Sequence, residues 1–383
     1  MIGFGWEDIY KIVEAMLPLY VALALGYGSV KWLRMFKSNE CDAINRFNCY
    51  FIIPFFTFHF TSGVDPYHLN FRFLGADVIA KAIAGVGLAL WIHFSKKDPS
   101  WLITSFSLSS FNNTLVVGVP LLKAMYGGLG EDLVVQSSVI QSLVWLPILL
   151  FMFEFRRACG SKNIGSCIDE ENGPEKQLRA MSSATQTVPQ SSSGTVAIEI
   201  VDQDYDDNTV KSSVALSSSR FLSFMKKVWV RLSRNPNNYA CVLGLIWALL
   251  ANRWNLKMPG IVEGSILIMS KAGSGVAMFN MGLFMALQES VLGCGVGLCM
   301  YGMVLRFVGG PMSTAVGSLA LGLHSNVLRI AIMQAALPQA IISFVFAQEY
   351  GLHANLLSAA VIFGTIISLP LLIVYYLILN LIH

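Results

Sequence analysis

Two short stretches carry the strongest structural signal of this chain: Asn112-Asn113-Thr114-Leu115-Val116-Val117-Gly118-Val119-Pro120 and Gln334-Ala335-Ala336-Leu337-Pro338-Gln339-Ala340-Ile341. Each sets amides and a proline inside an otherwise apolar run. Proline lacks the backbone N–H, so a helix that contains it leaves polar groups for other partners to satisfy. Matched interruptions of this kind are the best pointer from sequence to the binding site of a carrier. We therefore expect two broken, crossing helices with Pro120 and Pro338 at the breaks; a pair of ordinary proline kinks is the alternative.

The composition around these stretches is that of a membrane protein. Of the 383 residues, 55% are hydrophobic and only 13% are charged, and the mean hydropathy is +0.60. Soluble domains average about 25% charged residues, so we do not expect a soluble enzyme. The net charge of +3 is too small to indicate a nucleic-acid partner. The sequence has no HExxH, GxSxG or P-loop pattern, and we assign no catalytic residue, metal site or cofactor.

Several apolar segments are long enough to cross a bilayer, which takes about 20 residues in a helix. We expect ten, five on each side of a polar central stretch: residues 9–30, 43–60, 73–94, 101–126, 133–155, 238–251, 261–287, 292–319, 328–347 and 356–382. Because each half has an odd number of segments, the second half enters the membrane in the opposite sense. The predicted fold is an all-α integral membrane protein of two inverted five-helix repeats, with broken, crossing fourth and ninth helices.

The central stretch divides the chain into three predicted parts. Residues 1–155 form the first repeat and residues 235–383 form the second. Residues 156–234 contain serine runs and the acidic run 202–207 but few large apolar residues. They cannot bury enough surface to offset their ordering entropy, so we expect a largely disordered loop. Lysine and arginine follow the first, third and fifth segments, which places this loop in the cytosol; the second half supports that assignment poorly.

Charged side chains inside the apolar segments mark candidate functional positions. Asp77 and Lys81 lie four residues apart, so they share one face of the third segment. Each charge costs about 2.5–3.5 kcal/mol at the membrane centre on insertion scales, so we expect the two to pair and to face the protein interior. They either support a substrate site, together with Gln141, or form a structural ion pair near the membrane edge. Arg306 has no acidic residue in its own segment, and we expect it to pair elsewhere or to line a cavity.

Three motifs resemble those of one family. Asn235-Pro236-Asn237-Asn238-Tyr239 and the stretches 113–120 and 334–339 closely resemble the plant PIN-FORMED auxin efflux carriers, and the resemblance covers both membrane halves. The central loop is much shorter than in plasma-membrane members, so the chain looks like the short-loop type of the endoplasmic reticulum. The resemblance implies transport of the anion of the auxin indole-3-acetate between the cytosol and the endoplasmic reticulum lumen. It also implies an elevator-like alternating-access mechanism without obligatory ion coupling, in a homodimer surrounded by membrane lipid; the plasma membrane is the alternative location.

The resemblance further implies a substrate site. The residues implied to contact the substrate are two amides and two branched aliphatic residues: Asn113, Asn237, Ile341 and Ile53. The residues implied to support the site from behind are Asp77, Lys81 and Gln141. One position departs from the family, because several relatives carry tyrosine where this chain has Leu146. A polar group is therefore missing there, which bears on affinity and selectivity.

Two other functions remain open on the residues alone. One is a proton- or sodium-coupled organic-anion symporter, for which Asp77 is the only obvious coupling group. The other is a non-transporting membrane receptor or scaffold, which would show no flux and would tolerate changes at Asn113.

Overall fold

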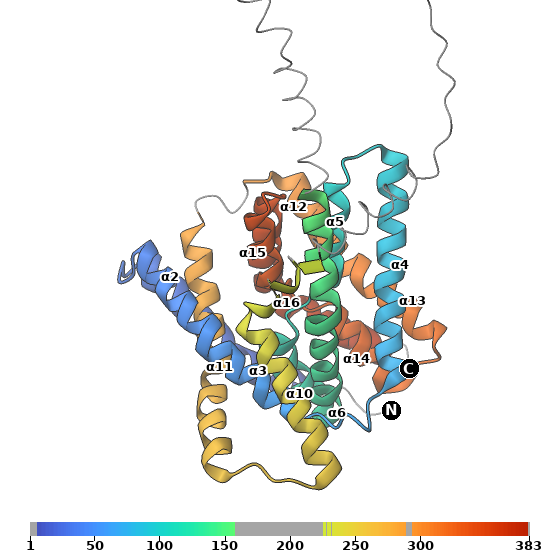
Figure 1. The fold of residues 1–383 in the computed structure, drawn as a ribbon. Helices are drawn as coiled ribbons and strands as arrows, with labels where there is room; N and C mark the ends of the chain where they lie inside the picture. Colours follow the sequence, from blue (N-terminus) through green and yellow to red (C-terminus); the bar gives the residue numbers. More distant parts are fainter. Residues whose placement is uncertain (1–5, 158–224, 227, 231, 289–292, 382–383) are drawn as a thin grey trace, which may run out of the picture. The chain divides into compact units, whose positions relative to one another are not determined.

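The structure, a computed structural model, describes residues 6–157, 225–226, 228–230, 232–288 and 293–381. All regular secondary structure in these residues is helical (Figure 1). The chain divides into one unit of Met1–Leu150 with Arg231–His383 and a second unit of Phe151–Val230. The loop expected at 156–234 lies mostly outside the described residues, so its disorder and the three-part division remain predictions.

Helices follow the predicted segments in both halves of the larger unit. The first half contains α1 (Trp6–Lys31), α2 (Ser38–Phe47), η1 (Asn48–Ile52), α3 (Ile53–Ser62), α4 (Phe71–Ser95), α5 (Ser100–Ser110), η2 (Thr114–Gly118), α6 (Val119–Ile140) and η3 (Gln141–Trp145). The second half contains α10 (Pro236–Trp254), α11 (Gly260–Leu287), α12 (Val296–Val304), η4 (Leu305–Gly309), α13 (Gly310–Ala320), α14 (Ser325–Ala335), α15 (Ile341–Glu349) and α16 (Ala354–Leu381). The elements labelled η are π-helical turns.

Five helical stretches of the described residues are long and apolar enough to cross a membrane, judged by length and composition: Ile9–Lys31, Phe71–Ser95, Thr114–Arg157, Gly260–Leu287 and Ala354–Leu381. The stretch Thr114–Arg157 includes a turn at Gly127. An all-helical architecture with several candidate spans is therefore confirmed for the part of the chain that the structure describes. The number of ten spans and their inverted relation stay predictions.

Helix α6 contains the turn that separates the predicted fourth and fifth segments. Gly127 has φ 64° and ψ −147°, a conformation that is open to glycine and strained for other residues. The chain doubles back at this point. Lys123 and Glu131, on either side of the turn, form an ion pair of 2.7 Å, and a Cβ at Gly130 would lie 2.2 Å from the carbonyl oxygen of Leu122. The two segments therefore pack as an antiparallel pair.

Four π-helical turns each end two residues before a proline. The turns η1, η2, η3 and η4 precede Pro54, Pro120, Pro147 and Pro311. Proline has no N–H for the carbonyl four residues before it. The wider turn shifts the hydrogen-bond ladder, so that the N–H of Val119, just before Pro120, reaches the carbonyl oxygen of Thr114. These prolines are therefore accommodated without a break in the helix.

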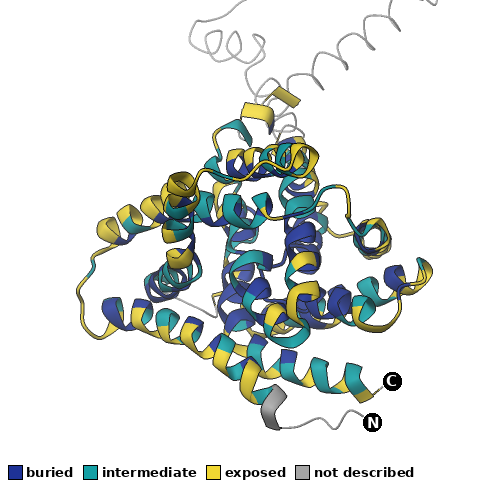
Figure 2. Cartoon of the chain, turned by 90° about the horizontal axis from the view of Figure 1, so that it is seen from below, coloured by how far each residue is buried: buried dark blue, intermediate teal, exposed yellow. Residues whose placement is uncertain are grey.

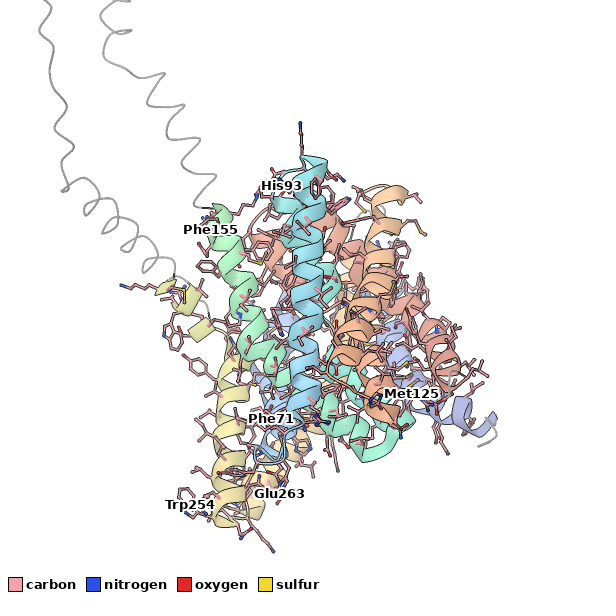
Figure 3. All side chains as sticks on the ribbon, turned by 90° about the vertical axis from the view of Figure 1, so that its right-hand side faces the viewer. Phe71, His93, Met125, Phe155, Trp254 and Glu263 are labelled. Atoms are coloured by element: carbon pink, nitrogen blue, oxygen red, sulfur yellow. The ribbon has the colours of Figure 1, made fainter. Side chains whose placement is uncertain are left out.

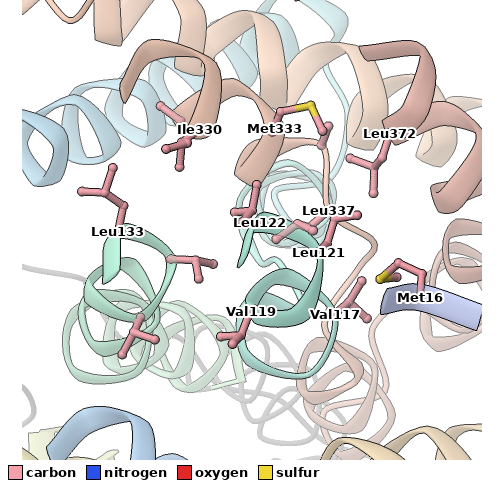
Figure 4. Close-up of a cluster of buried hydrophobic side chains, with 14 of the residues drawn as sticks. Met16, Val117, Val119, Leu121, Leu122, Leu133, Ile330, Met333, Leu337 and Leu372 are labelled. Atoms are coloured by element: carbon pink, nitrogen blue, oxygen red, sulfur yellow. The ribbon is translucent and has the colours of Figure 1, made fainter. Parts of the chain in front are cut away.

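A buried apolar core lies where α6 meets helices from the other half of the chain. Figure 4 shows Leu121 and Leu122 of α6 beside Met333 of α14, with Leu337 and Leu372 close by, and all five side chains are completely buried. Lipid is as apolar as leucine, so close van der Waals packing rather than exclusion of water holds such helices together in a membrane. This packing fixes the position of α6 next to α14.

Helices α1 and α11 cross at a glycine contact. A Cβ at Gly26 would lie 2.1 Å from the carbonyl oxygen of Phe279, and a Cβ at Gly282 would lie 2.1 Å from that of Leu23. Small residues allow this close backbone approach in membrane proteins. Figure 2 shows buried residues along the helix faces that turn toward other helices. The opposite faces carry large exposed apolar side chains, as lipid-facing surface does.

Candidate functional site

The two broken helices meet at their breaks, one between α5 and η2 and the other between α14 and α15. The N–H of Asn113 donates to the carbonyl oxygen of Pro338 at 2.9 Å, and the N–H of Ala340 donates to the carbonyl oxygen of Phe111 at 3.1 Å. In Figure 1, α5 and α15 lie in the upper part of the view and α14 lies lower. Each break therefore satisfies the backbone of the other, as a non-helical segment inside a membrane requires.

Side-chain amides reinforce the crossing. The amide nitrogen of Asn112 donates to the carbonyl oxygen of Gln334 at 2.8 Å, and that of Gln339 donates to the carbonyl oxygen of Ser107 at 3.1 Å. Gln334 in turn donates to the hydroxyl of Ser137 on α6. All three amides are buried. These motif residues hold the crossing together, which gives them a structural role that differs from that of Asn113.

A cavity of about 570 Å³ lies on the face of the crossing where the second halves of both broken helices begin. Protein ligand pockets measure about 300–1,000 Å³. The lining combines apolar surface with many side-chain amides, and it comes from α2, η1, α3, α6, η3, α10, α11 and the first turns after both breaks. The four residues implied to contact the substrate all line it: Asn113, Asn237, Ile341 and Ile53.

Asn113 is the lining residue closest to the crossing whose side chain is free. Its backbone is held by bonds to Pro338 and Gly118, while its half-buried amide makes no hydrogen bond to another described residue. The N–H groups in the first turn of a helix have no intrahelical acceptor, and they carry partial positive charge. Thr114–Val116 and Ile341–Ile342 occupy such turns at the cavity. This wall can therefore bind an anion.

Asn237 reaches the cavity from the start of α10. Its backbone N–H donates to the side chain of Asn235 at 3.0 Å, and its amide oxygen accepts the hydroxyl of Thr57 at 2.5 Å. Asn235 caps the start of α10, a position that favours asparagine, and Pro236 occupies the first helical position, which suits proline. The hydroxyl of Thr57 occupies the amide oxygen of Asn237, so its amide nitrogen is the group left for a ligand.

Gln141 positions the break in the fourth segment. Its amide oxygen accepts the N–H of Asn112 at 3.1 Å, and its amide nitrogen donates to the carbonyl oxygen of Asn112 at 2.8 Å. Gln141 also lines the large cavity. Its hydrogen bonds go to Asn112 and not to Asp77 or Lys81, so the structure separates the expected polar support into two groups.

A second cavity, of about 20 Å³, lies on the opposite face, where the first halves of the broken helices end. Asp77 and Lys81 line it and form an ion pair of 2.9 Å with side chains 12% and 7% exposed. They belong to α4, which extends between the labelled Phe71 and His93 in Figure 3. The indole N–H of Trp145 donates to the same Asp77 oxygen at 3.0 Å. A space of this volume holds about one water molecule and no organic substrate.

Arg306 has an environment that its sequence position did not indicate. It lies in η4 with 0% of its surface exposed, and its guanidinium donates to the amide oxygen of Asn112. Its other acceptors are four backbone carbonyl oxygens, at 3.1, 3.4, 3.0 and 2.7 Å: those of Leu108, Phe111, Ala335 and Leu337. A lone arginine in an apolar run is the sequence signal for a buried, partnered charge. Its partners are backbone carbonyls, which every residue type carries, so the sequence does not identify them.

Pro120 and Pro338 lie at different positions relative to the two helix breaks. Pro338 lies in the break between α14 and α15, and its carbonyl accepts the N–H of Asn113. Pro120 lies in the first turn of α6, after the helix has restarted at Thr114 through η2. Because the π-helical turn accommodates Pro120, the break falls earlier in the chain. The expectation that Pro120 marks the break is corrected accordingly.

Comparison with known proteins gives consistent matches over nearly the whole chain. A family model described as a membrane transport protein matches residues 11–376. The chain is 53% identical to auxin efflux carrier component 5 of Arabidopsis thaliana over 384 aligned residues, which cover 100% of both chains. It is 35% identical to auxin efflux carrier component 8 of Arabidopsis thaliana, over 98% of this chain and 100% of that relative. The matched family and both relatives are membrane transporters rather than enzymes.

Proposed function

This chain belongs to the PIN-FORMED auxin efflux carrier family of membrane transport proteins, and from that premise we propose that it carries the anion of indole-3-acetate across a membrane. The chain is a multi-pass membrane protein, given its family and its apolar helices. The observation that carries the proposal is the 570 Å³ cavity, in which Asn113 presents a free amide beside two helix starts.

The chemistry of this cavity suits a flat apolar acid. The carboxylate of indole-3-acetate would accept hydrogen bonds from Asn113 and from the first-turn N–H groups after both breaks. The indole ring would lie against Ile53 and Ile341, on the apolar part of the lining. Asn237 would offer its amide nitrogen from the opposite helix. This arrangement holds the anion without a cation in direct contact, which keeps binding weak enough for release.

The mechanism proposed is elevator-like alternating access without obligatory ion coupling. In this scheme ten helices form two inverted five-helix repeats, and the last three helices of each repeat move as one body past the first two. The hydrogen-bonded crossing supports this division, because a moving body must carry its binding site without distortion. The glycine contact between α1 and α11 supports a rigid body on the other side.

The proposed setting is the endoplasmic reticulum membrane, with the protein as a homodimer. The support for this membrane is the short central stretch, residues 156–234, by which the chain resembles the short-loop type; auxin efflux carrier component 5 aligns with this chain over 100% of both. The plasma membrane is the alternative location.

A proton-coupled symporter is a second candidate. The Asp77–Lys81 ion pair is buried directly behind the crossing, where a change in protonation would reach the site. A sodium-coupled symporter on the same fold is the related alternative. One flux experiment distinguishes proton- or sodium-coupled symport from uncoupled transport.

The test is uptake of labelled indole-3-acetate into liposomes that contain the purified full chain. We expect uptake without an imposed proton or sodium gradient, at a rate well above the slow diffusion of the neutral acid into protein-free liposomes. Uptake that requires a gradient would replace the uncoupled scheme with a symporter. A folded protein that binds indole-3-acetate but never moves it would indicate a receptor, and a folded protein that does not bind it would refute the proposed substrate.

A further inference from the structure

We propose that Arg306 sets the preference of the carrier for a singly charged anion, although it is not among the residues that line the large cavity. This inference rests on the proposed function and adds a specificity-determining residue to it. Arg306 acts through the crossing, so it is a positioning residue rather than a ligand contact.

The cavity has no cation of its own. Its lining contains no lysine, arginine or histidine among the described residues, and its one carboxylate is the exposed Asp42. An anion that enters this space must therefore be stabilised by backbone dipoles and by charge located behind the wall. The nearest candidate is a guanidinium that bonds a residue of the wall itself.

Arg306 is connected to both faces of the crossing through Asn112. The guanidinium donates to the amide oxygen of Asn112, and Asn112 lines the small cavity and the large one. The next residue along the chain is Asn113, whose free amide faces the large cavity. The positive charge is thus one side chain away from the anion-binding wall, and it is fully buried, where charges are screened less than in bulk water.

The same guanidinium neutralises the two helix ends that would repel an anion. Leu108 lies in the last turn of α5 and Phe111 follows that helix, while Ala335 ends α14 and Leu337 lies two residues beyond it. Arg306 donates to all four carbonyls. A helix C-terminus carries about half an elementary negative charge. Two such ends therefore carry about one negative charge, which one guanidinium cancels.

The N-terminal ends of the two helices that follow the breaks keep their partial positive charge. The starts of the η2–α6 helix and of α15 carry about half a positive charge each, and both border the large cavity. The Asp77–Lys81 pair is neutral as a unit and does not alter the sum. The crossing therefore presents about one net positive charge to the cavity, which matches a monoanion. Without Arg306, the C-terminal ends would cancel that charge.

The experiment compares two ligands of the same shape and different charge, indole-3-acetate and the neutral indole-3-acetamide. Their dissociation constants are measured on detergent-purified full chain for wild type, Arg306→Gln, Arg306→Lys and the control Arg329→Gln. Arg329 bonds Asn380 away from the crossing, so its variant removes an arginine charge without touching this network. Thermal melting and size-exclusion profiles verify that each variant is folded.

We expect wild type and Arg329→Gln to bind indole-3-acetate more tightly than indole-3-acetamide. In Arg306→Gln the ratio of the two dissociation constants should fall about tenfold, the effect of one charge at a separation of about 10 Å and an effective dielectric constant of about 20. A purely structural role would weaken both ligands equally, and an unchanged ratio in Arg306→Gln would overturn the inference. Should Arg306→Gln not fold, Arg306→Lys decides, measured at a pH low enough to keep the buried lysine protonated: its charge must then preserve the ratio, and a ratio lost at that pH overturns the inference. Failure of wild type to bind indole-3-acetate refutes the proposed function instead.

Discussion

The two faces of the helix crossing differ in almost every physical respect. One face carries a cavity of about 570 Å³, a free amide at Asn113 and the starts of two helices. The other carries a space of about 20 Å³, the Asp77–Lys81 pair and Arg306 bonded to the ends of two helices. Apart from the exposed carboxylate of Asp42, these formal charges lie on the face whose space is too small for an organic substrate. Only their field, transmitted through the crossing, reaches the face where an organic anion fits.

This contrast predicts that breaking the Asp77–Lys81 pair acts on stability, whereas changes on the cavity face act on binding. The largest expected effect comes from Asp77→Asn, which leaves the buried Lys81 ammonium without its partner. Breaking a buried ion pair costs about 3–5 kcal/mol, while replacing both members by uncharged residues costs far less. The thermal midpoint of Asp77→Asn should fall clearly, and the double variant Asp77→Asn/Lys81→Met should recover most of the loss. Equal melting of wild type and single variant would contradict the structural reading.

Asn113→Ala tests the opposite face. A hydrogen bond to a charged group contributes about 1.5–3 kcal/mol, so indole-3-acetate should bind about a hundredfold more weakly while the melting temperature stays near that of wild type. Asn252→Ala is the matched control, because the amide of Asn252 bonds the carbonyl of Ala248 in its own helix at 2.9 Å. Calorimetric titration measures the affinity of both variants for indole-3-acetate, and thermal melting measures their stability. Full binding by Asn113→Ala would remove the crossing from the substrate site.

Gln141→Leu probes the boundary between the two faces. It removes both hydrogen bonds to the backbone of Asn112, each of which contributes about 0.5–1.5 kcal/mol. Because Gln141 positions the break, we expect a loss of about tenfold in affinity together with a small loss of stability. An affinity for Gln141→Leu equal to that of wild type would show that the break holds its shape unaided.

Leu146→Tyr should have the smallest effect. Leu146 is buried and lines the large cavity, so a tyrosine there adds a hydroxyl to an apolar stretch of wall. We expect indole-3-acetate to bind a few-fold more tightly, the range of one hydrogen bond. Leu146→Phe adds the ring without the hydroxyl and should show no gain. A gain of the same size in both variants would trace the effect to packing rather than to hydrogen bonding.

The sequence predicted features that depend on local pattern. Pro338 was expected at a break and lies there, whereas Pro120 lies about two turns after the first break. Asp77 and Lys81 were expected to pair because helical periodicity sets them on one face. Asn113 and Asn237 were assigned by family resemblance, and their placement on one cavity agrees with it, although their contact with substrate remains a proposal. No local sequence pattern relates Asn113 to Asn237.

Features that depend on backbone groups far apart in the chain were not predictable. The carbonyls that bond Arg306 include that of Leu108, 198 residues away, and any residue type offers the same carbonyl. Pro120 shows a subtler limit. The pattern indicates that a proline disturbs the helix, but whether the chain breaks or widens into a π-helical turn depends on packing around α6.

The hydrogen bonds across the crossing have a consequence for how the protein is made. Asn112 and the residue whose carbonyl it bonds, Gln334, are 222 positions apart. Ribosomes add about 5–20 residues per second, so roughly ten to forty-five seconds separate the emergence of one partner from that of the other. During that interval the first break has polar groups inside the bilayer and no native acceptor for them. Newly made first halves should therefore need water or an assisting membrane protein at this position until the second half arrives.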